Sequence, residues 1–258
     1  MRRLAIAIAL SLAISFPAVP QTSQSALPTP DQAAALVVSQ SAAALGNLPG
    51  DLTATGTVHV VAGSLVEDGT IHILARGAGQ SAEICSTPSA LRQSLYSNGA
   101  LYLIQASVSS KASYERAAVG HAADFPLQLL ANALGSPDYA FQTVGVEQVN
   151  GSAALHVRVW NTYNSIPGLQ PVAPFSLQDL WIDQASHLLL RLSYVERFGG
   201  GSAPAIPMEV TYSAYKNVSG VMFPFSIQKS RDGTPWQTIT IQQVSLNTGL
   251  TSAAFTVQ

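Results

Sequence analysis

Apolar and polar residues alternate most regularly over residues 177–194, where the sequence predicts two strands joined by a short turn. In the first strand Leu180 and Ile182 alternate with Trp181 and two aspartates. Since successive side chains of a strand point to opposite faces, the second strand should have one wholly apolar face, made of Leu188, Leu190, Leu192 and Tyr194. Asp183 ends the first strand, where its carboxylate can accept backbone N–H bonds and shape the turn.

The same alternation recurs between residues 52 and 246 and predicts about ten or eleven strands. Asn-Gly or Asp-Gly pairs at 68–69, 98–99, 150–151 and 232–233 are strong signals for tight hairpin turns. Strands joined by hairpins form an antiparallel sheet, and so many strands cannot stay flat. The pattern therefore predicts one curled sheet: a barrel, a half-barrel or two packed layers.

Helical spacing appears twice in the chain. Residues 29–45 should form a helix with Thr29 as N-cap, Pro30 at the first helical position and Gln32 in a capping box. A second helix is predicted over residues 124–134, and its apolar side should cover the sheet. Residues 107–120 fit either a loop or an edge strand, and residues 166–174 fit a loop within the sheet.

Composition narrows the class of protein. Of the 258 residues only 10% are charged, against about 25% in ordinary soluble domains, and the net charge of −2 gives no basic surface for nucleic acid. Residues 1–21 resemble a secretory signal, with Arg2 and Arg3 before an apolar run of about 13 residues, shorter than the ~20 that span a bilayer. The alternative is a buried N-terminal helix. We expect Sec-type export to the periplasm or medium, a linker over residues 22–28 and one domain over residues 29–258.

Motifs for catalysis, cofactors or metals are not found in the sequence. Cys85 is the only cysteine, so it cannot form an internal disulfide, and we expect it to be a small packing residue. We expect the five histidines, which stand singly, to be exposed or at a rim; the alternative is that two of them pair across neighbouring strands and bind metal. The scattered residues are His59, His72, His121, His156 and His187.

We expect the charged and aromatic residues of the 177–194 hairpin to have structural roles and not catalytic ones. Asp179 and Asp183 share a strand face about 13 Å apart, too far for a glycosidase pair. Arg191 is expected to pair across the hairpin with one of them. All three tryptophans of the chain, Trp160, Trp181 and Trp236, are expected in the core or at its rim, with a sugar-binding platform as the alternative.

The C-terminal half resembles the bacterial outer-membrane lipoprotein-sorting carriers, the LolA-like proteins. The similarity lies in Leu180–Asp183 followed by Leu188–Arg191, in the segment 210–225, and in the end of the chain from Val244 to Phe255. This resemblance implies a mainly β (α+β) fold: an incomplete antiparallel barrel with helices on its concave side. Sorting members of that family carry acyl chains, whereas this chain is longer around residues 107–135 and looks like a relative of unknown role.

These observations predict an exported, non-enzymatic, monomeric protein that binds a lipid or another long apolar ligand without a cofactor or metal. We expect the wall of the site to be Leu190, Leu192, Tyr212, Phe223 and Phe225, with Phe125, Leu129 and Leu130 at its entrance. No titratable side chains are expected to converge in it. One alternative is the same fold with a filled core, contacting a membrane or an envelope protein; another is a hydrolase that uses His156 or His187.

Overall fold

The computed structural model describes residues 27–106, 108–198 and 202–257. The predicted signal segment and most of the predicted linker lie outside the described residues. Within these ranges, no helix combines the length and the apolar character needed to cross a bilayer.

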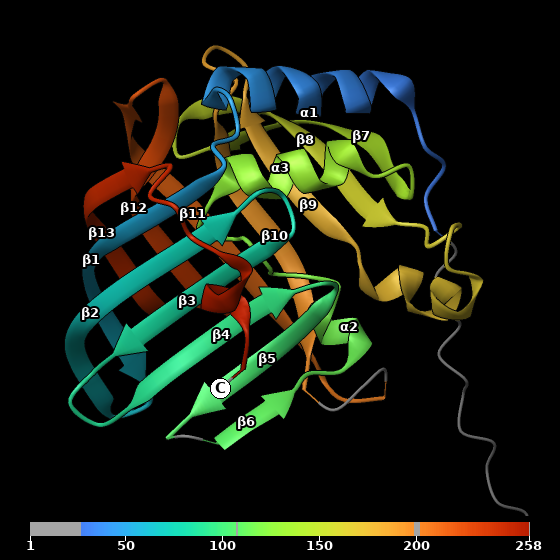
Figure 1. The fold of residues 1–258 in the computed structure, drawn as a ribbon. Helices are drawn as coiled ribbons and strands as arrows, with labels where there is room; N and C mark the ends of the chain where they lie inside the picture. Colours follow the sequence, from blue (N-terminus) through green and yellow to red (C-terminus); the bar gives the residue numbers. More distant parts are fainter. Residues whose placement is uncertain (1–26, 107, 199–201, 258) are drawn as a thin grey trace, which may run out of the picture.

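Thirteen strands form one antiparallel sheet, which curls without closing (Figure 1). The predicted class, a mainly β incomplete barrel, is confirmed, with more strands than the ten or eleven expected. In spatial order the strands are β6 (Val108–Lys111), β5 (Ala100–Gln105), β4 (Leu91–Ser97), β3 (Gln80–Ser86), β2 (Leu65–Arg76), β1 (Asp51–Ala62), β13 (Thr234–Leu246), β12 (Val221–Arg231), β11 (Ala205–Val218), β10 (Leu189–Arg197), β9 (Gln178–Asp183), β8 (Ser152–Asn161) and β7 (Tyr139–Val149).

The first and last strands pair in the middle of the sheet, so β6 and β7 become its two edges. Because neighbouring strands run antiparallel, five hairpins turn at the same end of the sheet: β1–β2, β3–β4, β5–β6, β10–β11 and β12–β13. We call this end the hairpin end. The β8–β9 connection also lies at this end, and the opposite end carries the β2–β3, β4–β5, β7–β8, β9–β10 and β11–β12 turns.

Two longer helices, α1 (Gln32–Leu45) and α3 (Pro126–Gly135), lie inside the curve of the sheet and against each other (Figure 1). The predicted N-cap was wrong: Asp31, not Thr29, caps α1 by accepting the Ala34 N–H at 2.6 Å. Asp31 also accepts the Thr143 N–H of β7 at 2.7 Å. A carboxylate can bond both segments at once, which explains why the helix starts two residues late.

Three shorter helical segments complete the fold. Residues 107–120, left open by the sequence, contain the edge strand β6 and then α2 (Tyr114–Ala117). The expected loop at 166–174 is the 3-10 helix η1 (Pro167–Phe175), and η2 (Ser252–Phe255) seats Phe255 against Leu74 and Ala82.

A β-bulge in β10 changes the predicted faces of the central hairpin. Leu189 pairs with Ile182 and Arg191 with Trp181, so Leu190 is an extra residue in its strand. Such a bulge moves the residues beyond it to the other face. Leu189 and Leu192 therefore lie in the concave core, whereas Leu190 packs on the convex face beside Trp181. The predicted concave position of Leu190 was wrong.

Candidate functional site

The concave side contains a cavity of about 900 Å³. Its walls are the concave faces of β1–β5 and β10–β13, together with the segment that precedes α3. Its apolar lining residues include Val60, Ile73, Leu101, Leu103, Phe125 and Met208. The concave side is thus neither wholly filled nor wholly empty, and the version of the fold with a filled core does not describe this region.

The lining reaches the hairpin end of the sheet, where the cavity meets solvent. Ala62, Val108, Phe198 and Arg231 all line the cavity and stand beside hairpin turns. Val108 is 72% exposed and Phe198 43% exposed, so apolar surface continues from the cavity to the outside.

We call the part of the concave side that contains the cavity the open half. Residues 112–125, which we call the cover segment, bridge its two sides. Within the cover segment, α2 contacts both β5 and β10. Arg116 pairs with Glu196 of β10 at 2.5 Å, and Tyr212 donates its hydroxyl to the Ala123 carbonyl at 2.7 Å. Gly120, at φ +74°, lies so close to Tyr194 that an added Cβ would be 2.8 Å from the phenol oxygen. The segment is therefore fastened to the sheet at several points.

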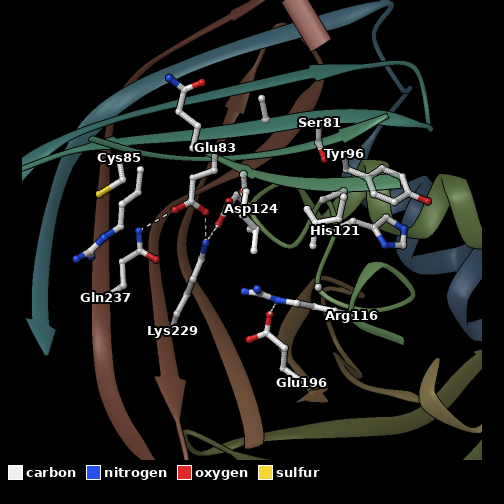
Figure 2. Close-up of a pocket in the computed structure, with 18 of the residues that line it drawn as sticks. Ser81, Glu83, Cys85, Tyr96, Arg116, His121, Asp124, Glu196, Lys229 and Gln237 are labelled. Carbon is white, nitrogen blue, oxygen red and sulfur yellow. Dashed lines mark hydrogen bonds and ion pairs between the residues drawn. The ribbon is translucent and has the colours of Figure 1, made fainter. Parts of the chain in front are cut away.

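Three ionisable side chains meet in the cavity wall (Figure 2). The Lys229 ammonium of β12 donates to the Glu83 carboxylate of β3 and lies 2.7 Å from an Asp124 oxygen of the cover segment. Gln237 donates its amide to the other Glu83 oxygen at 2.9 Å. The expectation that no titratable groups converge was wrong. Asp124 was predicted to open the second helix, but it lies before the N-cap of α3 and its carboxyl group contacts Lys229 instead.

The cluster holds two carboxyl groups and one ammonium, so it can be neutral only if one carboxyl keeps a proton. Burial, and then the charge of Glu83, raise the pKa of Asp124 to about 8. Burial disfavours ionised Glu83, but the Lys229 charge and hydrogen bonds outweigh it and lower the pKa of Glu83 to about 2. Burial likewise opposes the Lys229 charge, yet its two carboxylate neighbours raise the pKa of its ammonium. Near neutral pH the cluster therefore carries Glu83⁻, Lys229⁺ and a protonated Asp124.

The inner end of the cavity is more polar. His121 stacks on Tyr96 with ring centroids 4.1 Å apart, and its Nε2 lies 3.1 Å from the Asn132 amide nitrogen. Burial lowers the pKa of His121 to about 4, so its ring is neutral at pH 7. Gln128 donates to the Gly77 and Gln80 carbonyls, both at 2.7 Å. These groups hold the inner wall together.

Only one of the eight residues predicted for the ligand site, Phe125, lines the cavity. Five others are buried in the core: Leu129, Leu130, Leu192, Tyr212 and Phe223. Phe225 is half-buried against that core, and Leu190 is on the convex face. A pattern of apolar positions identifies the concave face, but it does not say which part of that face the helices occupy.

The sequence did contain a signal for one missed residue. Lys229 continues the strand phase of Phe223 and Ile227, both fully buried, so alternation places its side chain on the concave face. A lysine in that phase needs an anionic partner. Its partners could not be identified from sequence, since Glu83 and Asp124 are far away in the chain.

The convex face gathers other charged residues around Trp181. His156 stacks on this indole at 4.3 Å, and its ring nitrogens lie 2.7 Å from Glu147 and 2.9 Å from Asp179. The expectation of an exposed or rim histidine was wrong for His156, which is 7% exposed, and for His121, which is 6% exposed.

Arg191 was predicted to pair with Asp179 or Asp183, and this was wrong. Its guanidinium lies over the Trp181 ring at 3.6 Å and within 3.6 Å of both Glu147 and Glu209. Asp179 is paired with Arg158 instead, because these two are cross-strand partners. Asp183 does close its turn, accepting the Ala185 and Ser186 N–H groups as expected.

Groups of three or more metal-ligating side chains are not found in the described part of the chain. His59 bonds Asp68, its neighbour across the β1–β2 hairpin, at 2.8 Å. His187 lies in the β9–β10 turn. Neither lines the cavity.

Solved structures with the same architecture exist, although no protein-family model and no curated protein matches the sequence. A putative outer membrane lipoprotein-sorting protein domain from Vibrio parahaemolyticus aligns over 85% of this chain and 95% of its own, with 13% identity and a TM-score of 0.57. A LolA superfamily protein from Nitrosomonas europaea aligns over 86% and 97%, with 15% identity and a TM-score of 0.58. A DUF1329 family protein from Desulfovibrio piger aligns over 90% and 100%, with 13% identity and a TM-score of 0.57. The predicted LolA-like fold is confirmed.

Proposed function

We propose that this chain is an exported, non-enzymatic protein that binds a lipid or another long apolar ligand in the cavity of the open half. The observation that carries the proposal is an unfilled cavity of about 900 Å³ with a largely apolar wall. Small-molecule sites typically measure ~300–1,000 Å³, so this cavity is at the upper end of that range. Its LolA-like fold supports the proposal, because the similar domain from Vibrio parahaemolyticus is described as lipoprotein-sorting.

Affinity would come from removing the ligand's surface from water. Each buried methylene contributes about 0.8 kcal/mol, so a chain of some ten methylenes gains about 8 kcal/mol before the costs of association. Phe125 is the one sequence-predicted residue that we propose as a direct contact. We propose that the five predicted residues that are buried in the core act indirectly, by fixing the shape of the cavity wall.

The protonation states of Lys229 and Cys85, which line the cavity, support a binding role and not a catalytic one. A raised pKa keeps Lys229 protonated between its two carboxyl partners, so its amine is not a nucleophile. Burial raises the pKa of the Cys85 thiol, so only a small fraction is thiolate at neutral pH and Cys85 is a weak nucleophile. We propose export on the basis of residues 1–21 and expect the mature protein to be a monomer.

Cys85 gives a direct test, because the only thiol of the chain lines the cavity. Palmitate should slow alkylation of Cys85 by a small maleimide, and organic extraction of the purified protein followed by mass spectrometry should release a bound lipid. Leu103→Trp should abolish the protection by filling the cavity. Tyr102→Trp is the matched control, since Tyr102 is the neighbour of Leu103 on β5 and does not line the cavity.

Two results would count against the proposal. One is a protein that carries no extractable ligand and whose Cys85 reacts equally fast with and without fatty acids. The other is equal palmitate affinity in Leu103→Trp and Tyr102→Trp.

A further inference from the structure

Charge pairing around the cavity is uneven. Four cationic side chains line it: Arg92, Arg116, Lys229 and Arg231. Lys229 is held by Glu83 and Asp124, and Arg116 by Glu196. All 14 Asp and Glu side chains of the sequence lie in the described residues, and none of them forms an ion pair with Arg92 or Arg231.

Both arginines without a carboxylate stand at the hairpin end. Arg231 is the last residue of β12, and Arg92 is the second residue of β4, just after the β3–β4 turn. The Arg231 guanidinium lies over the Trp236 ring at 4.9 Å and is 5.7 Å from the Phe198 ring centroid. Aromatic rings hold a guanidinium in place but leave its N–H donors free for an anion.

The interior offers an anion no comparable place. The Lys229 ammonium, which lies in the interior, already has two carboxyl partners. An anionic head beside Glu83 would meet a like charge in a buried site. The apolar wall between the hairpin end and Phe125 has room for a hydrocarbon chain.

From this arrangement we infer that the ligand is an amphiphile with an anionic head, a carboxylate or a phosphate. Arg231 holds the head at the hairpin end, Arg92 adds to the positive potential there, and the tail runs inward toward Phe125. This inference rests on the proposed function and adds the chemical class and orientation of the ligand.

Calorimetric titration with three probes of equal chain length tests the class of head. Palmitate and hexadecyl phosphate should bind at least about tenfold more tightly than hexadecanol, the gain expected of a charge-assisted hydrogen bond. The better of the two anions identifies the head as carboxylate or phosphate.

Variants then test the position of the head. Arg231→Gln should reduce the affinity for both anionic probes about tenfold and leave hexadecanol unchanged, whereas Arg231→Lys should keep part of the preference. Arg92→Gln should have a smaller effect of the same sign. Arg76→Gln is the matched control, because Arg76 is exposed at the opposite end of the sheet and does not line the cavity.

The outcomes separate this inference from the function on which it rests. Equal binding of all three probes would overturn the anionic head and leave lipid binding standing. A loss of affinity in Arg92→Gln without one in Arg231→Gln would overturn the position of the head. Binding of none of the probes would contradict the proposed function itself.

Discussion

The two halves of the concave side cover the apolar face of the sheet in different ways. We call the part under α1 and α3 the packed half, and the other part is the open half. Under α1 and α3, buried side chains fill the space between helices and sheet, with Phe125 and Phe223 rings 5.6 Å apart. Toward the hairpin end, the cover segment bridges β5 and β10 through α2 but leaves a cavity of about 900 Å³ beneath it. One continuous sheet thus carries a packed core and an unfilled cavity side by side.

The difference shows what holds each half together. In the packed half, a cluster of buried apolar side chains joins the helices to the sheet. The open half lacks that contact, and polar contacts fasten its cover segment: the protonated Asp124 to Lys229, Arg116 to Glu196 and Tyr212 to Ala123. An unfilled apolar cavity costs free energy, so a ligand that fills it would stabilise this half specifically.

Truncating one side chain in each half should give the largest contrast. Phe223→Ala removes a fully buried ring and should lower the free energy of unfolding by about 4 kcal/mol. Leu103→Ala should cost about 1 kcal/mol or less, because half-buried Leu103 already faces the cavity and its removal makes no new void. Urea unfolding measures both, and equal losses would mean that the two halves are packed alike.

Breaking the ion cluster should have the next largest effect. Lys229→Met leaves two buried carboxyl groups without their cation and should lower the free energy of unfolding by about 3 kcal/mol at pH 7. Adding Glu83→Gln and Asp124→Asn removes the uncompensated groups and should recover most of that loss. If Lys229→Met alone is as stable as the wild type, the cluster does not fasten the cover segment.

A smaller effect should appear as a dependence on pH. Because the pKa of Asp124 rises from 3.8 to about 8 on folding, the folded chain holds a proton that the unfolded chain has released. Its contribution to stability is full below pH 3.8 and is lost as pH rises to about 8. Between pH 7.5 and 8.5, above the range in which His121 titrates in either state, the wild type should lose up to about 1 kcal/mol per pH unit.

Asp124→Asn should flatten this slope, as measured by urea unfolding at several pH values. Asp232→Asn, at the exposed β12–β13 turn, serves as the control and should keep the wild-type slope. An unchanged slope in Asp124→Asn would show that Asp124 is ionised in the folded protein.

Local sequence patterns were enough to predict most of the strands, both longer helices and three of the four Asn-Gly or Asp-Gly turns, since each depends on spacing within a short segment. The turn predicted at residues 68–69 was wrong, because both residues lie inside β2 and pair with β1. The LolA-like fold was predicted from the resemblance of the C-terminal half. The faces of β10 were mispredicted because the bulge at Leu190 adds one residue that no pattern of apolar positions reveals. The cavity wall was mispredicted for a different reason. Whether a helix covers Phe223 or leaves Leu103 open depends on how distant segments pack, and so does the meeting of Glu83, Asp124 and Lys229.

Hydrogen exchange of backbone amides, with and without palmitate, tests the contrast between the two halves most directly. If the open half is a binding cavity, palmitate should slow exchange in β3–β5 and in the cover segment and leave α1, β7 and β8 unchanged. Protection spread evenly over both halves, or none anywhere at saturating palmitate, would contradict the account.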